Sequence, residues 1–344
     1  MVKKMMNFLV LFTAIAALGF LSNCSKDEDD PAGSKTALNS LIDESQELHD
    51  GAVEGTSVGF YEVGSKATFQ TAIDAAQSVA DTDGATQSTI DAAVANLNAA
   101  KTTFEASQIQ DVSTEGLVGQ WLFDGNADDY TGNGNDGTPT EGDAFFGGGT
   151  PVLTTDRFGN EDNAYFFNNG AFINVPYTLA LNPASISISI WVNATEIREN
   201  NRFLGLHSWE GYKFQLQSAN KSFFTAATED GIYDKDTDPP LEISTWYHLV
   251  VTYESGSMKF YVDGELTQEY TDVTGSLVTV EDHDLAIGVG SSKYAVDDSN
   301  WETDHIIPAP WGGYFHGELD DIRLYNRALS GQEVSSIYNL EKPQ

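Results

Sequence analysis

The 344-residue sequence contains one cysteine, Cys24, so the chain cannot form an intramolecular disulfide. Its folded part must be stabilised by core packing, with bound metal as the other available cross-link. The six histidines show neither a His-Glu-x-x-His motif nor any other spacing typical of a zinc site. The Gly-x-Ser-x-Gly motif of serine hydrolases is also missing from the sequence.

Positive charge is scarce as well. The chain has 17 Lys plus Arg against 52 Asp plus Glu, which gives a net charge of -35 at pH 7. No cluster of basic residues is visible along the sequence. Such a field repels nucleic acid and other polyanions unless a local basic patch or a cation intervenes. We therefore expect no nucleic-acid partner.

A long hydrophobic run is also absent, because the apolar stretch 8–21 is too short to span a bilayer comfortably. It follows Lys3 and Lys4, and this pattern is typical of a secretory signal peptide. The segment 21–24, Leu-Ser-Asn-Cys, resembles the bacterial lipobox, although Asn23 stands where that pattern usually has Gly or Ala. The resemblance implies cleavage after residue 23 and acylation of Cys24. An ordinary signal peptide with a chance cysteine is the alternative.

An acidic run at 25–30 follows directly and resembles the surface-export signal of Bacteroidetes lipoproteins. Such a charge block is also a solvated tether. Together these features predict a signal peptide over 1–23, an acidic tether over 24–36, and a protein lipid-anchored to the outer membrane that faces the cell exterior. Two or three acyl chains would hold it there almost permanently.

Residues 37–108 have apolar residues at helical spacing in three stretches separated by glycine-bearing turns. We expect a small antiparallel three-helix bundle. The stripes consist of Leu38, Leu41, Ile42 and Leu48; of Phe69, Ile73, Ala76 and Ala80; and of Ile90, Val94, Leu97 and Phe104. These residues, with Gly59-Phe60-Tyr61 opening a turn, resemble the FIVAR module, a spacer or accessory binding unit of surface proteins.

From residue 116 onward the sequence alternates between apolar and polar residues and is rich in glycine and aromatic residues. Residues 185–192 and 245–253 predict half-buried strands, and 259–266 predicts a hairpin around Asp263-Gly264. Ser330-Gly331-Gln332-Glu333 predicts a capping box that begins a short final helix. The fold class that we expect is mainly β, a two-sheet antiparallel jelly-roll sandwich preceded by the helical bundle.

Five motifs occur in order over 116–340: Trp121-Leu122-Phe123-Asp124, the Gly/Asn-rich loop 129–137, Asp156-Arg157-Phe158-Gly159, 172–176, and 317–330. This region resembles the laminin-G-like, concanavalin A-like jelly rolls of bacterial surface proteins. The resemblance implies a structural calcium held by Asp129, Asn133 or Asn135, and one of Asp320 and Asp321. Oxygen ligands of this kind suit calcium. The alternative is a tight turn, with the aspartates solvated or paired with Arg323 and Arg327.

A second candidate site is aromatic. A long irregular stretch carries Tyr294, Trp301, His305 and Trp311, and a separate loop or short hairpin carries Trp209 and Tyr212. An exposed indole suits the C–H face of a sugar, while neighbouring polar groups bind its hydroxyls. The alternative is that these rings plug the edge of the sandwich, since tryptophans are mostly buried.

Glycosidases on such sandwiches need two facing carboxylates, and the nearest approach here is Glu318-x-Asp320, without the family's Glu-x-Asp-x-Glu signature. We therefore predict a non-catalytic surface lipoprotein that binds a glycan or polysaccharide through its jelly roll. An adhesion or assembly protein that recognises another protein, within an uptake or adhesion complex, is the first alternative. A polysaccharide-active enzyme is the second.

Overall fold

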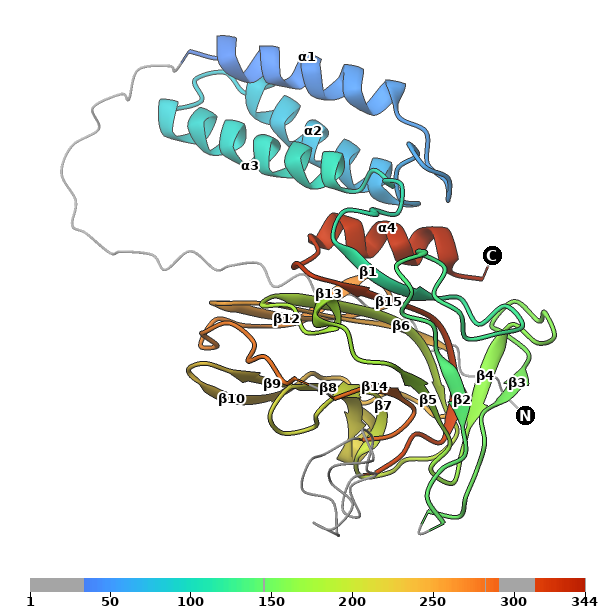
Figure 1. The fold of residues 1–344 in the computed structure, drawn as a ribbon. Helices are drawn as coiled ribbons and strands as arrows, with labels where there is room; N and C mark the ends of the chain where they lie inside the picture. Colours follow the sequence, from blue (N-terminus) through green and yellow to red (C-terminus); the bar gives the residue numbers. More distant parts are fainter. Residues whose placement is uncertain (1–33, 145, 282, 291–312, 344) are drawn as a thin grey trace, which may run out of the picture.

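The structure is a computed structural model that describes residues 34–343, except for 145, 282 and 291–312. Three helices form a bundle, and two facing β-sheets form a sandwich beneath it (Figure 1). A fourth helix, α4 (Gly331–Glu341), lies between the bundle and the eight-stranded sheet (Figure 1). Among the described residues, none of the helices is both long and apolar enough to cross a membrane.

The bundle consists of α1 (Thr36–Gly51), α2 (Ser65–Asp81) and α3 (Gln87–Ala106). The predicted stripes form its core, with Leu38, Phe69, Ile73, Ile90 and Leu97 each at most 2% exposed. The ring of Phe104 stacks on Phe69 and on Tyr61, at 4.5 Å between ring centroids in each pair. Burial of these apolar stripes stabilises helices whose sequences alone would be marginal in water.

The sandwich confirms the predicted fold class. The eight-stranded sheet has the order β13-β12-β11-β6-β15-β4-β3, and β1 also pairs with β15. The seven-stranded sheet has the order β10-β9-β8-β7-β14-β5-β2. The strands of the first sheet are β1 (Leu117–Trp121), β3 (Val152–Thr154), β4 (Ala164–Phe167), β6 (Ile186–Ala194), β11 (Tyr247–Glu254), β12 (Ser257–Val262), β13 (Glu265–Tyr270) and β15 (Gly317–Tyr325). Those of the second are β2 (Thr138–Thr140), β5 (Phe172–Val175), β7 (Asn201–Leu206), β8 (Tyr212–Gln217), β9 (Lys221–Thr228), β10 (Gly231–Asp236) and β14 (Leu285–Ile287).

Strand β6 shows how the alternating sequence builds the core. Ile186, Ile188 and Ile190 are fully buried members of the large core cluster of the sandwich. Ser187 and Ser189, on the opposite face, are buried too: Ser187 contacts the segment leading to α4, and Ser189 bonds to His248 on β11. The Ser187 hydroxyl donates to the Arg327 carbonyl at 2.8 Å, so burial leaves no polar atom of this side chain unpaired.

The predicted turn and helix start are both confirmed. Asp263 and Gly264 have φ values of 51° and 82° between β12 and β13, which is the left-handed geometry of a tight hairpin. At the start of α4 the Ser330 hydroxyl accepts from the Glu333 amide at 3.2 Å, and the Glu333 carboxylate accepts from the Ser330 amide at 2.8 Å. This reciprocal pair is the capping box.

Helix α4 also joins the two domains. The Ser336 hydroxyl accepts from the Gln110 amide at 2.9 Å, and the Gln332 side chain donates to the Gln108 carbonyl at 3.0 Å. Farther along, the Asn339 side chain donates to Glu62 at 3.0 Å. These bonds dock the bundle on the same helix that covers the eight-stranded sheet.

Candidate functional site

The residues predicted for sugar binding fall into two groups. Tyr294, Trp301, His305 and Trp311 lie outside the described residues, as does Cys24. Trp209 and Tyr212 are described, and they lie where β7 turns into β8.

Tyr212 needs a correction, because it is the first residue of β8 and is directed into the core. Its side chain is fully buried, and its hydroxyl donates to the Leu181 carbonyl at 2.7 Å. Burial also raises the pKa of its phenol well above the usual range. Tyr212 therefore offers no surface to a ligand, and its predicted role in sugar binding is wrong.

Trp209 is half-buried, and a cation lies against its ring. The Lys213 ammonium is 3.6 Å from the centroid of the indole, a distance that gives a strong cation–π contact. The Arg202 guanidinium lies 6.0 Å from the same ring. The indole therefore forms the partly exposed rim of a positively charged group of residues.

Strand register explains why these residues meet. Arg202 on β7 is opposite Gln215 on β8, and Lys213 is opposite Thr225 on β9. Asp234 on β10 is in turn opposite Thr225. The alternate residues Tyr212, Phe214 and Leu216 are directed into the core. Since side chains alternate along a strand, the polar ones gather on the outer face of the seven-stranded sheet.

We call Arg202, Ser208, Trp209, Lys213, Gln215 and Asp234 the Arg202–Lys213 cluster. Arg202 Nε donates to Gln215 at 3.1 Å, and its Nη1 donates to the Ser208 hydroxyl at 3.1 Å. Lys213 Nζ donates to the Ser208 carbonyl at 3.0 Å and lies 4.0 Å from an Asp234 oxygen. Arg202 Nη2 is buried and has no hydrogen-bond partner in the structure as described.

Both cations are almost fully buried, at 1% exposure each. Burial lowers the pKa of Arg202 to about 10. Burial also lowers the pKa of Lys213 to about 7, an effect that the Arg202 charge reinforces and the Asp234 charge opposes. The cluster therefore holds two desolvated positive charges against one nearby carboxylate, an arrangement that an added anion would stabilise.

A hollow of about 620 Å³ adjoins the cluster at Trp209, which is the cluster residue that lines it. Trp209 and Glu210 line it from the β7–β8 turn, and His207 lies beside His283 with ring centroids 4.8 Å apart. The segment 278–281 and Ile232 complete its wall. An aromatic ring with carboxylate and imidazole groups around it is the composition expected of a small polar-ligand site.

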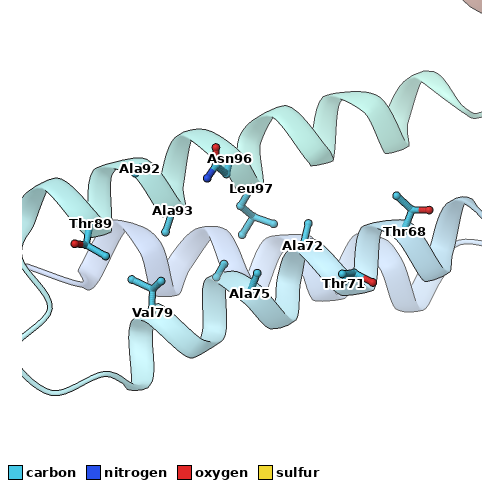
Figure 2. Close-up of a pocket in the computed structure, with 11 residues that line it drawn as sticks. Thr68, Thr71, Ala72, Ala75, Val79, Thr89, Ala92, Ala93, Asn96 and Leu97 are labelled. Carbon is cyan, nitrogen blue, oxygen red and sulfur yellow. The ribbon is translucent and has the colours of Figure 1, made fainter. Parts of the chain in front are cut away.

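A different hollow lies between α2 and α3, where the alanine and valine side chains of α2 face Ala93 and Leu97 of α3 (Figure 2). Its volume is about 790 Å³, and its lining contains alanine, threonine, valine, leucine and asparagine. No aromatic or charged side chain lines it. This groove lacks the stacking surface that a sugar uses, so the sandwich is the better candidate for sugar binding.

The loop predicted to hold calcium is closed by its own hydrogen bonds. The Asp129 carboxylate accepts from the backbone amides of Gln120, Thr131 and Asn135 at 3.0–3.1 Å, and from the Thr131 hydroxyl. The Asn135 side chain donates to the Val118 carbonyl at 2.9 Å. Donors that surround the carboxylate in this way fit a tight turn.

Asn133 is exposed, and its side-chain amide donates to the Val118 carbonyl at 2.9 Å and to the Leu117 carbonyl at 3.3 Å.

Asp320 and Asp321 have a partner that the sequence did not suggest. Arg157 donates to both carboxylates, and its guanidinium lies 4.5 Å from the centroid of the Trp191 ring. Arg323 and Arg327, the predicted partners, pair with Glu341 and Glu333 instead. These ion pairs fasten β15 and α4 to neighbouring segments. The predicted calcium ligands are thus divided between two groups with separate partners: Asp129 bonds within its own loop, and Asp320 and Asp321 bond to Arg157.

In the described part of the chain, no group of three or more His, Cys, Asp or Glu side chains is arranged to hold a metal ion.

The Glu318-x-Asp320 pair lies on β15, on the outer face of the eight-stranded sheet. Glu318 accepts from the Asn193 side chain at 2.8 Å, and burial raises its pKa. Burial and the Asp321 charge also raise the pKa of Asp320, against the attraction of Arg157. Arg157 binds the Asp320 carboxylate, and Asn193 binds that of Glu318. Both carboxylates therefore make structural contacts within the protein.

Sequence reasoning missed Arg202 and Lys213. The alternation in Lys213-Phe214-Gln215-Leu216-Gln217 predicts a polar outer face of a strand. Lysine on such a face is normally solvated. No local signal indicates that the outer face of β8 is buried as completely as the inner one.

Comparison with known families matches this architecture. The model of the concanavalin A-like lectin/glucanases superfamily matches residues 167–335, and the FIVAR domain model matches residues 34–105. These two matches fall on the helical bundle and on the sandwich, the regions in which the sequence motifs resemble the same two families.

Individual relatives are more distant. A curated protein named gellan lyase, from a Bacillus species, is 39% identical over 74 residues, which are 22% of this chain and 3% of that protein. This chain thus corresponds to a small part of that relative.

Domain 4 of AbnA, a GH43 extracellular arabinanase from Geobacillus stearothermophilus solved with arabinotriose, is 20% identical with a TM-score of 0.50. The match covers 64% of this chain and 98% of that domain. The binding domain of Paraclostridial Mosquitocidal Protein 1 is 14% identical with a TM-score of 0.47, over 65% of this chain and 52% of that one. These similarities concern the fold.

Proposed function

We propose that this protein binds a carbohydrate through the outer face of its seven-stranded sheet and performs no chemistry of its own. The observation that carries the proposal is the half-buried Trp209 at the edge of a hollow that also contains Glu210 and two histidines. The indole supplies the flat apolar surface on which a sugar ring stacks. The polar groups around it supply hydrogen bonds that fix the orientation of the sugar.

The comparisons support the same class of ligand. The matched family is described as containing lectins and glucanases, and the similar domain of the arabinanase was solved with arabinotriose. The engagement of Asp320 by Arg157 supports a binding role over hydrolysis, because a glycosidase needs two free carboxylates across the bond that it cleaves.

We further propose, from the sequence features at Cys24 and in 25–30, that the protein is a lipoprotein held on the outer surface of the outer membrane. The helical bundle then acts as a spacer between the anchor and the sandwich. A bound structural calcium remains a separate hypothesis.

The first experiment compares wild-type protein with Trp209→Ala in isothermal titration against a panel of neutral and acidic polysaccharides. We expect at least one ligand, with affinity about 2- to 10-fold weaker in the variant, because stacking on an aromatic ring contributes about 0.5–1.5 kcal/mol beyond the buried area. Tyr130→Ala is the matched control, since Tyr130 is an aromatic residue that is 74% exposed in another loop.

Unchanged affinity in Trp209→Ala with retained binding would move the site elsewhere on the molecule. Absence of binding across the panel would favour the second function, recognition of another protein. The apolar groove between α2 and α3 is the observation that favours this second function (Figure 2).

A further inference from the structure

Two buried cations on one face are unusual in a chain of net charge -35. Lys and Arg are almost never fully buried unless they are paired. Here Lys213 has a carboxylate oxygen of Asp234 no closer than 4.0 Å, and that Asp234 oxygen already accepts from the Thr225 hydroxyl. Arg202 Nη2 has no acceptor among the described residues. Among the described residues, the donors of this cluster therefore exceed its acceptors.

The kind of donor in this cluster indicates which ligand it would bind. A guanidinium binds a carboxylate through two parallel N–H bonds, and a neighbouring ammonium adds a point charge. Ser208 fixes both groups, since its hydroxyl accepts from Arg202 and its carbonyl accepts from Lys213. Groups fixed in this way lose little entropy when an anion arrives.

We propose that the Arg202–Lys213 cluster binds the carboxylate of an acidic sugar, such as a uronate or a sialate, while the sugar ring stacks on Trp209. This inference rests on the proposed function and names its ligand class. Lys213 Nζ lies 3.6 Å from the centroid of the Trp209 ring, so the positive charge is next to the surface on which the sugar stacks.

The charge of the whole molecule agrees with one local anion site. A net negative field repels polyanions in general, but a desolvated pair of cations attracts a single carboxylate at short range, where screening is weak. We therefore expect recognition of the anion as part of a glycan and little attraction for acidic polymers that lack sugars.

The test uses the full chain and pairs of probes that differ only in charge. Uronate-containing and sialate-containing oligosaccharides are compared by isothermal titration with the same oligosaccharides after reduction of their carboxyls to alcohols. We expect the acidic form to bind at least tenfold more tightly. Sodium acetate and polyglutamate are run in parallel, to separate a sugar carboxylate from a free carboxylate or an acidic peptide.

The decisive variant is Lys213→Met, which keeps the length of the side chain and removes its charge. We expect its affinity for the acidic form to fall about 10- to 100-fold, the range for a lost charge-assisted hydrogen bond, and its affinity for the reduced form to stay unchanged. Lys259→Met, a substitution of a lysine that pairs with Glu269 on the other sheet, is the matched control. Thermal melting of each variant verifies the fold.

Melting of Lys213→Met is also informative by itself. Removal of a buried charge that lacks a close partner is expected to leave the melting temperature unchanged or to raise it. A variant that is stable and fails to bind acidic sugar supports the proposal.

Each other outcome has a definite meaning. Equal binding of acidic and reduced forms, or binding of neutral glycans alone, would overturn the acidic-sugar inference and leave glycan binding intact. Binding of acetate or polyglutamate as tight as that of the acidic sugars would overturn the role of the ring. No binding of any glycan by folded wild-type protein would overturn both proposals.

Discussion

At the scale of single residues, Lys213 shows how a fold changes the chemistry of a side chain. An ordinary lysine is charged at every physiological pH. Burial on the outer face of β8, next to Arg202, lowers the pKa of Lys213 to about 7. The charge of this one residue therefore depends on conditions that leave other lysines unaffected.

A pH dependence of binding follows for the acidic sugars. Because a carboxylate binds the protonated amine, we expect affinity to fall about tenfold as pH rises from 6 to 8 through a pKa of about 7. Arg202 stays charged over this range, and Asp234 is the carboxylate that faces Lys213. Titrations at three pH values measure the effect.

The controls separate Lys213 from its neighbours. His207 and His283 are ionisable groups that line the adjacent hollow. Lys213→Met should flatten the pH profile if the lysine is responsible. A steep profile that persists in this variant would show that a group other than Lys213 carries the effect.

Trp209 and Tyr212 illustrate the limit of sequence reasoning at this scale. They are three residues apart, and the sequence predicted both as sugar-binding rings of one loop or short hairpin. The structure separates them, because β8 begins at Tyr212 and the alternation of the strand directs that ring into the core. The sequence does not indicate the residue at which the strand begins.

At the scale of secondary-structure elements, local rules were reliable. The serine–isoleucine alternation of 185–190 predicted β6, the Asp-Gly pair predicted the hairpin between β12 and β13, and the capping box predicted the start of α4. Each of these signals depends on residues within about four positions of one another. Such short-range geometry is determined by the backbone itself.

Long-range partners were not predictable in this way. Arg157 and the aspartates of β15 are more than 160 positions apart, and nothing local relates them. The same holds for the docking bonds between α4 and the bundle, which join residues more than 220 positions apart. Pairing of this kind depends on how the whole sandwich closes.

The capping box of α4 leads to a prediction about acid stability. Hydrogen bonds from Arg327 and Ser330 lower the pKa of Glu333 to about 2 in the folded protein, below its unfolded value of 4.5. The resulting stabilisation is present above pH 4.5 and is lost as pH falls toward 2. Glu333→Gln should therefore lower the melting temperature of the sandwich by about 2–4 °C at pH 7, the effect of roughly 1 kcal/mol.

The size of this difference should change with pH. Between pH 4 and pH 2 the melting temperatures of wild-type protein and Glu333→Gln should converge, because the wild-type carboxylate becomes protonated. Glu265→Gln, at an exposed position of β13, is the matched control. A constant difference at all pH values would show that the charge of Glu333 does not carry the effect.

At the scale of the whole molecule, the chain cannot form an intramolecular disulfide, so its stability depends on core packing. One continuous core fills the space between the sheets, from Trp121 and Phe167 to Phe203 and Phe214, all at most 1% exposed. Burial of that much apolar surface is the main stabilising contribution to a sandwich of this size.

Stability through packing also predicts how the protein responds to removal of calcium. Because the Asp129 carboxylate is already bonded within its own loop, and Asp320 and Asp321 are held by Arg157, we expect a chelator to leave the melting temperature unchanged within about 1 °C. Differential scanning calorimetry with EDTA and with excess calcium makes the measurement. A rise of several degrees with calcium would establish the metal site predicted from the sequence.

The position of β15 has a consequence for how the protein is made. This strand lies between β6 on one side and β1 and β4 on the other, yet it follows every other described strand along the chain. During synthesis the eight-stranded sheet therefore lacks its middle until residue 325 has emerged, and the edges of β4 and β6 that pair with β15 stay unpaired until then. The sandwich therefore closes only after nearly all of its strands have been made.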